Sequence, residues 1–212
     1  FGVPAGFFFF LAAFSTDAGQ TLSTGEGGMV VTQAQDLYDR ARALHDHGHA
    51  YQPEVPRGRD AAVCVGFNYR MTEIQAAIGL AQLQKLDFIR NEQRKNKQAL
   101  VERMGELPAV FRRSIDPSGD AGDTLVFLMP NPESSREMVK LLGAGGISTK
   151  NLPDAMNWHF AGHWRHLCPQ REKHMPSDVG HWPKSEGILN RCVSLGISVK
   201  MRSEDLDRVA EV

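Results

Sequence analysis

The sequence predicts an α/β fold in which short strands and longer helices share one chain of 212 residues. Three observations support this class. The first part is apolar and punctuated by glycine, which is typical of buried strands and tight turns. The middle part repeats apolar residues at helical spacing. The last part alternates Pro- and Gly-rich turns with short apolar runs. We therefore expect three regions, residues 1–70, 71–104 and 105–212.

The first region opens on an uncharged stretch, Phe1 to Ser15, that contains four consecutive phenylalanines. The stretch is too short for a membrane span and has no basic leader. It predicts a strand buried on both faces of a sheet. A chain that starts inside such a strand is expected to be a fragment of something longer. The turn from Thr24 to Gly28 predicts a second strand over 29–31, and a helix is expected from Asp36 to Asp46.

The second region predicts helix. Thr72 and Gln75 fit a capping box, with a hydroxyl residue at the cap and Gln three residues later. Apolar residues then recur at helical spacing through Ile89. The continuation to Met104 is polar, with Leu100 and Met104 as its anchors, and it forms either one bent helix or two.

The third region predicts a small domain of strands and helices. Residues 125–129 and 192–199 are expected to be strands. Residues 134–142 and 203–212 are expected to be helices, each with a serine at its N-cap.

Composition excludes several classes of protein. Lys and Arg number 24 and Asp and Glu number 25, so the basic excess typical of nucleic-acid binders is missing. Three scattered cysteines cannot form a disulfide framework, and their odd number fits a reducing, cytoplasmic compartment. No apolar run is long enough for a polytopic membrane protein. We expect neither a nucleic-acid nor a membrane partner.

Two histidine groups could suggest a metal site. One runs from His45 to His49, and the other comprises His159, His163, His166 and Cys168. Neither has the ligand spacing of a recognised zinc site. We predict a polar loop and a pocket-forming loop respectively, and no metal, although metal binding through these histidines stays a weak alternative.

Two longer motifs resemble a known family. Residues 14–28 read Phe-Ser-Thr-Asp-Ala-Gly-Gln-Thr-Leu-Ser-Thr-Gly-Glu-Gly-Gly, and residues 66–73 read Gly-Phe-Asn-Tyr-Arg-Met-Thr-Glu. The second is followed by Ala76-Ala77-Ile78-Gly79-Leu80 and Gln82-Leu83. In this order they are similar to the lysine segment and the second signature of the DegT/StrS sugar aminotransferases, pyridoxal-phosphate (PLP) enzymes of fold type I.

The resemblance implies the carboxy-terminal part of such an enzyme. Residues 1–70 would end the large PLP-binding domain, residues 71–104 would form connecting and interface helices, and residues 105–212 would form the small α/β domain. It further implies a homodimer with shared active sites and transfer of an amino group, usually from glutamate, to a keto or aldehydo sugar. Such reactions serve the synthesis of surface glycans such as lipopolysaccharide.

The resemblance also assigns site residues. Ser15 matches the family serine that donates to the cofactor phosphate, and Asn68 matches the asparagine that reaches the phosphate across the subunit interface. Gln20 stands at the position of the Schiff-base lysine. Lys150 to Pro153 and Trp158 to Phe160 look most similar to enzymes that aminate C8 of 3-deoxy-manno-octulosonate.

Two departures from the family pattern predict that the chain is inactive as written. A carboxamide at position 20 is neither a nucleophile nor a base, and the family's amino-terminal half is missing. Two alternatives follow. The chain could belong to a lysine-free PLP or PMP enzyme (PMP is the amine form of the cofactor) that dehydrates a sugar, with His159 or His163 as base. It could otherwise be a pseudoenzyme that completes the site of an active paralogue through Asn68.

Overall fold

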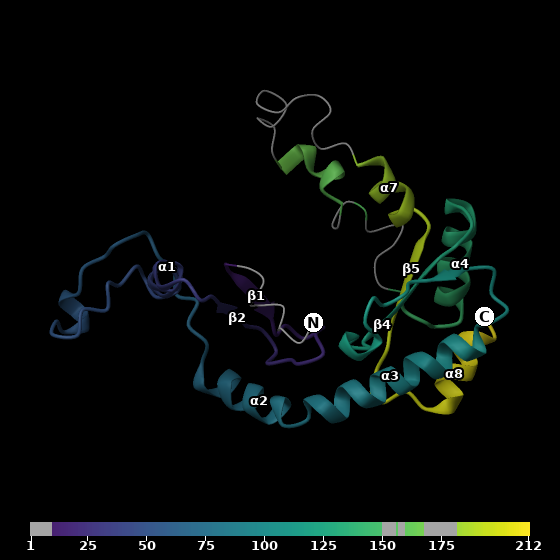
Figure 1. Ribbon diagram of the computed structural model, residues 1–212, viewed down its shortest axis with the longest axis horizontal. Helices are drawn as coiled ribbons and strands as arrows, with labels where there is room; N and C mark the ends of the chain where they lie inside the picture. Colours follow the sequence, from purple (N-terminus) through teal and green to yellow (C-terminus); the bar gives the residue numbers. More distant parts are fainter. Residues whose placement is uncertain (1–9, 150–155, 157–159, 168–181) are drawn as a thin grey trace. The chain divides into compact units, whose positions relative to one another are not determined.

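The computed structural model describes residues 10–149, 156, 160–167 and 182–212 (Figure 1). The chain divides into two compact units, Phe1–Leu86 and Asp87–Val212. In the described ranges no helix combines the length and the apolar character needed to cross a membrane.

The first unit is built on a two-stranded antiparallel sheet. Strand β1 (Ala12–Ser15) pairs with β2 (Gly28–Val31), so that Ser15 lies opposite Gly28. A Cβ atom on Gly28 would lie 2.4 Å from the carbonyl oxygen of Phe14, and glycine is therefore required where the strands meet. The residues between the strands form a hairpin loop that follows Ser15 and carries Gln20.

Helices and a looped segment complete the first unit. Helix α1 (Gln35–His45) is followed by a 3₁₀ turn, η2 (Arg57–Arg59), and by helix α2 (Glu73–Leu83). Two isolated antiparallel bridges, Asp46 with Asn68 and His49 with Ala62, hold the looped segment together. Gly48 permits this close pairing, because its φ is +82° and a Cβ there would lie 2.0 Å from the Cys64 carbonyl oxygen.

The second unit is a three-stranded antiparallel sheet with helices packed against it. The strands β3 (Val110–Phe111), β4 (Thr124–Leu128) and β5 (Cys192–Gly196) lie in the order β3-β4-β5. The helical elements are α3 (Leu86–Arg103), η3 (Pro117–Gly119), α4 (Pro132–Ala144), η4 (Ala161–Leu167), α7 (Pro183–Leu189) and α8 (Ser203–Ala210). The core lies where α3, α4 and α8 meet alternate side chains of β4 and β5, including Leu100, Phe127, Leu142 and Val193.

Most predicted elements are present. The strands after Gly28, at 124–128 and at 192–196 lie where the patterns place them, and Thr72 forms the predicted capping box with Gln75. The polar continuation is a second helix, α3, separated from α2 by a break at residues 84 and 85. Its predicted anchors Leu100 and Met104 are buried. The predicted serine caps are wrong: Asn131 caps α4 with Ser134 at N3, and Arg202 stands at the N-cap of α8.

The apolar opening is only partly described. Residues 1–9, and with them three of the four phenylalanines, lie outside the described residues. The prediction of a strand is right for Ala12–Ser15, but the prediction that this strand is buried on both faces is wrong for the described residues. The side chains of Phe10 and Phe14 are 86% and 50% exposed, because no described element packs over them.

Candidate functional site

Ser15 ends strand β1, Gln20 lies in the hairpin loop that follows, and both side chains bond to the same carboxylate. The Ser15 hydroxyl donates to Oδ2 of Asp17 at 3.1 Å, and Gln20 Nε2 donates to the same oxygen at 3.4 Å. The backbone N–H of Gly19 donates to Oδ1 of Asp17 at 2.6 Å. Three donors thus converge on one anionic group at the loop tip.

The base of this loop is held by a buried pair of hydroxyls. Oγ1 of Thr16 and Oγ1 of Thr24 lie 2.8 Å apart, and both threonines are buried. The Thr24 hydroxyl also donates to the carbonyl oxygen of Glu26 at 2.8 Å. Gln75 of α2 donates to the same carbonyl from Nε2 at 2.8 Å. The structure therefore brings the two sequence motifs into direct contact within one unit.

Asn68 lies at the other end of the looped segment and is oriented by a neighbouring arginine. Nε of Arg70 donates to Oδ1 of Asn68 at 3.0 Å. The same Nε lies 3.3 Å from Oδ1 of Asp46. The backbone of Asn68 is bridged to Asp46, and the N–H of Tyr69 donates to the carbonyl oxygen of His45 at 2.8 Å. Both the main chain and the side chain of Asn68 are consequently fixed.

Asp46 is the buried centre of this arrangement, with its side chain 3% exposed. Arg57 binds both carboxylate oxygens, with Nη1 at 2.8 Å from Oδ2, and the hydroxyl of Tyr51 donates to Oδ2 at 2.5 Å. The guanidinium of Arg57, then the hydroxyl of Tyr51, holds the pKa of Asp46 well below its usual range. The carboxylate is thus kept charged, and two arginines, Arg57 and Arg70, lie beside its single negative charge.

Of the two histidines predicted as alternative bases, only His163 is described, and it belongs to the second unit. His163 is in η4 of the second unit, where its ring contacts Phe160 and its Nε2 lies 3.8 Å from Oε1 of Glu186. His159 lies outside the described residues, as do residues 150–153. In the part of the chain that the structure covers, no three His, Cys, Asp or Glu side chains gather as metal ligands would.

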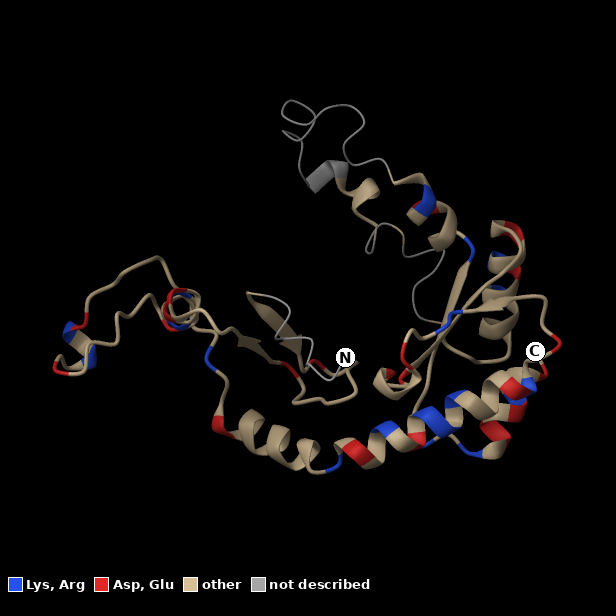
Figure 2. Ribbon diagram, in the orientation of Figure 1, with Lys and Arg blue, Asp and Glu red and all other residues tan. Residues whose placement is uncertain are grey.

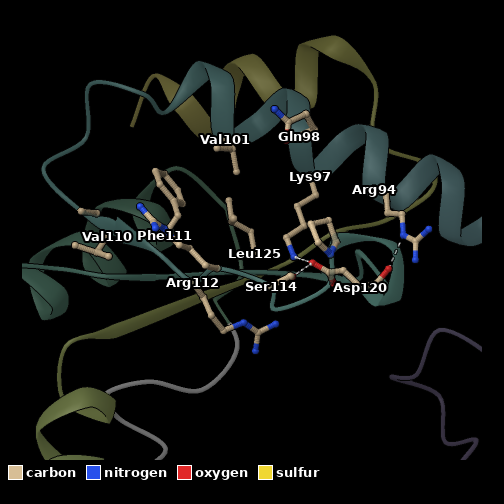
Figure 3. Close-up of a pocket in the computed structure, with 13 residues that line it drawn as sticks. Arg94, Lys97, Gln98, Val101, Val110, Phe111, Arg112, Ser114, Asp120 and Leu125 are labelled. Atoms are coloured by element: carbon tan, nitrogen blue, oxygen red, sulfur yellow. Dashed lines mark hydrogen bonds and ion pairs between the residues drawn. The ribbon is translucent and has the colours of Figure 1, made fainter. Parts of the chain in front are cut away.

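A pocket of about 670 Å³ lies in the second unit, beside α3, β3 and β4 (Figure 3). Nζ of Lys97 lies 2.5 Å from Oδ2 of Asp120, and Arg94 donates to the carbonyl oxygens of Ser118 and Asp120. Burial raises the pKa of Asp120, but Lys97, the Gly122 N–H and Ser114 outweigh it and lower the pKa to about 2. These two cations are therefore engaged with the protein itself.

The resemblance assigns no role to Asp17, Asp46 or Arg70, although Asp17 and Arg70 lie inside the two motifs. Each acts through a contact with a residue that the motifs did indicate. Asp17 stands two residues from Ser15 and three from Gln20, a spacing that could have suggested a turn. Asp46 and Arg70 are 24 residues apart, and only the fold brings them together.

The first unit offers hydrogen-bond donors for an anion, and its sequence has no lysine near the loop. Hydroxyl and carboxamide donors at Ser15 and Asn68 suit a phosphate. No hydrogen bond or ion pair joins Ser15 to Asn68 among the described residues. The first lysine of the chain is Lys85, so Gln20 is not replaced by an amine one or two residues away.

Comparisons with known proteins match this chain to sugar-modifying enzymes. A model of the DegT/DnrJ/EryC1/StrS aminotransferase family matches residues 2–212. GDP-perosamine synthase of Escherichia coli O157:H7 is 38% identical over 115 residues, which cover 54% of this chain and 30% of the relative. Spore coat polysaccharide biosynthesis protein SpsC of Bacillus subtilis is 24% identical over 94% of this chain and 51% of the relative.

A solved structure shares the fold over almost the whole chain. The Escherichia coli GDP-4-keto-6-deoxy-D-mannose-3-dehydratase with bound hydrated PLP has a TM-score of 0.78 and 18% sequence identity. The match covers 99% of this chain and 56% of the dehydratase. The chain thus spans about half the length, or less, of the proteins it resembles.

Proposed function

The chain belongs to the DegT/DnrJ/EryC1/StrS aminotransferase family, and we propose that it is the carboxy-terminal half of a PLP-dependent sugar aminotransferase. The amino acceptor would be a keto or aldehydo sugar, nucleotide-linked or free, and the donor would be glutamate. The name of one relative, a spore coat polysaccharide biosynthesis protein, supports a role in surface-glycan synthesis, and that of another, a GDP-perosamine synthase, supports a nucleotide-linked sugar. The match of the family model to residues 2–212 carries this proposal.

The residues present fit the phosphate of the cofactor. Asn68 would donate from its carboxamide nitrogen, and Ser15 would donate from its hydroxyl after turning away from Asp17. When bound, PLP supplies an electron-withdrawing ring that allows an amino group to pass between two substrates. Asn68 would serve the site of the partner subunit, so that each site uses residues from two chains.

Gln20 cannot form the covalent bond to PLP that the family lysine forms. The carboxamide nitrogen of Gln20 cannot attack a carbonyl, and it cannot hold or move a proton at neutral pH. We infer that the chain as written binds cofactor without completing amino transfer. The substitution removes both functions of the family lysine, the nucleophile and the base.

Restoring an amine at position 20 tests the proposal. The Gln20→Lys variant of the 212-residue chain is incubated with PLP, reduced with borohydride and analysed by intact mass and peptide mapping. We expect one cofactor adduct per chain at position 20 in the variant and none in the protein as written. Gln33→Lys is the matched control, because it adds an amine to an exposed glutamine of the same unit.

The possible outcomes separate the alternatives. Equal labelling of the Gln20→Lys and Gln33→Lys variants would contradict a cofactor site at this loop. A deoxy sugar formed by the unaltered protein from PMP and a keto sugar would instead establish a lysine-free dehydratase. A stable complex with a lysine-bearing paralogue, without cofactor binding by this chain alone, would establish a pseudoenzyme.

A further inference from the structure

The orientation of the Asn68 carboxamide is determined by chemistry as well as by geometry. A guanidinium carries only donors, so the Asn68 atom that faces Nε of Arg70 at 3.0 Å must be the oxygen. The nitrogen, with two N–H donors, then lies on the other branch of the carboxamide. Across the described part of the chain, the side-chain hydrogen bond of Asn68 is the one from Arg70 to its oxygen, and its nitrogen makes none. Both of its donors remain available to a ligand.

Arg70 is itself held in place by a buried charge. Asp46 lies 3.3 Å from Nε of Arg70, and the carboxylate is fixed by Arg57 and by the hydroxyl of Tyr51. Because the side chain of Asp46 is 3% exposed and that of Arg70 is 47% exposed, the pair anchors one edge of the guanidinium and leaves the other edge open. Asp46, Arg57 and Arg70 together carry one net positive charge, which favours an anion nearby.

We propose that Arg70 is a positioning residue for the cofactor phosphate, which fixes the Asn68 carboxamide so that Nδ2 faces the phosphate. Asp46 completes the arrangement by holding Nε of Arg70 between the two acceptors. The inference depends on the proposed function, because it requires Asn68 to bind the phosphate. It adds that Arg70 acts on the phosphate through Asn68 and does not contact the phosphate itself.

The reason is that a free carboxamide can present either its oxygen or its nitrogen. An oxygen turned toward a phosphate would repel it, and the site would spend part of its time in that orientation. With the oxygen bound to Arg70, only the donor orientation is populated. Losing one oriented hydrogen bond to a charged group corresponds to about a tenfold loss of affinity.

The test compares PLP with pyridoxal, which lacks the phosphate, in a double-mutant cycle. Dissociation constants of the 212-residue chain are measured by equilibrium dialysis, and the ratio of the pyridoxal constant to the PLP constant is the phosphate preference. The variants are Asn68→Ala, Arg70→Gln and the double variant. Arg59→Gln is the charge-matched control, since it removes an exposed arginine from the same looped segment.

We expect Asn68→Ala and Arg70→Gln each to lower the phosphate preference about tenfold, with pyridoxal binding unchanged. In the Asn68→Ala background, Arg70→Gln should add less than a twofold change. Arg70→Lys, which keeps the charge but lacks Nε, should lose most of the preference as well. It also provides a folded alternative if Arg70→Gln is unstable in thermal unfolding.

Two results would overturn the inference in different ways. A tenfold effect of Arg70→Gln that persists in the Asn68→Ala background, or full preference in Arg70→Lys, would show that Arg70 acts by its own charge. If the protein without substitutions binds PLP and pyridoxal equally well, so that the ratio of their dissociation constants is one, the phosphate site and with it the proposed function would be refuted.

Discussion

Asp17 places a negative charge where the loop would receive a phosphate. Its carboxylate accepts from the Ser15 hydroxyl at 3.1 Å, from the Gly19 N–H at 2.6 Å and from Gln20 Nε2 at 3.4 Å. A phosphate would compete for the same Ser15 donor and would meet like charge. The residue therefore influences both the binding of an anion and the basicity of any amine introduced at position 20.

This geometry predicts how Asp17 affects a restored lysine. In the Gln20→Lys variant, the carboxylate of Asp17 would stabilise the ammonium form and raise the pKa of the new amine. Adding Asp17→Asn should shift the pH midpoint of adduct formation with PLP downward, by about one unit. Rates are followed by borohydride trapping between pH 6 and 10, with Asp36→Asn as a control of equal charge in the same unit. An unchanged midpoint would show that Asp17 does not face the amine.

At the residue scale, the motifs indicated Ser15, Gln20 and Asn68, because each belongs to a run of identities that can be read along the chain. Asp17 and Arg70 lie within the same runs, but nothing in the runs indicates their contacts, and Asp46 lies outside both. Asp46 reaches Arg70 only because its bridge to Asn68 brings both ends of the looped segment together. Such a contact depends on the path of the backbone and leaves no periodic signal in the sequence.

At the element scale, helix α2 has the composition of a buried helix without being buried in this chain. Glu73 is its single charged residue, whereas α3 carries many charges of both signs (Figure 2). Ile74 and Leu80 are 74% and 65% exposed, and no residue of α2 is buried. A helix that is apolar on all sides is normally covered on all sides. This supports the proposal that α2 packs in a homodimer.

Charging the exposed face of α2 should therefore dissociate the dimer. Burying Leu80 contributes about 1.5–3 kcal/mol per copy, and a carboxylate there would be unpaired at an interface. Leu80→Glu should raise the dimer dissociation constant at least 100-fold, as measured by light scattering on a sizing column over a dilution series. Gln84→Glu adds the same charge at the exposed end of the helix and should leave the dimer intact. A dimeric Leu80→Glu variant would place the interface elsewhere.

Element types were more predictable than their ends. The capping box at Thr72 was found because both partners lie within four residues of one another. The caps of α4 and α8 were misplaced because the helices begin earlier than predicted: Asn131 stands three residues before Ser134, and Arg202 stands one residue before Ser203. Strand β3 has two residues, too few for any alternation to be detected, and its pairing with β4 depends on a distant segment.

At the scale of the whole molecule, each unit contains a largely buried carboxylate that is stabilised in its charged form. In the first unit, hydrogen bonds from Arg57 and Tyr51 keep the pKa of Asp46 well below its usual range. In the second unit, Lys97, the Gly122 N–H and Ser114 lower the pKa of Asp120 to about 2 against the opposing effect of burial. Both units should therefore lose stability in acid for the same physical reason.

The direction of this change in stability, and the pH range in which it occurs, follow from the lowered pKa values. A carboxyl group whose pKa is depressed in the folded state contributes its full stability above the unfolded pKa, near 4, and loses it as the pH falls toward the folded value. For Asp120, a change from 3.8 to about 2 corresponds to about 2 kcal/mol. We expect the free energy of unfolding of the second unit to fall by about this amount between pH 4 and pH 2.

Urea unfolding, followed by circular dichroism between pH 2 and pH 6, measures this dependence. In Asp120→Asn the decrease below pH 4 should shrink by about 2 kcal/mol, because the variant has no carboxylate to protonate at that position. Asp87→Asn is the matched control, since it removes the same charge from a side chain that is 93% exposed. An Asp120→Asn protein that loses stability in acid as steeply as the unaltered one would show that Lys97 and Asp120 do not stabilise the fold through their charges.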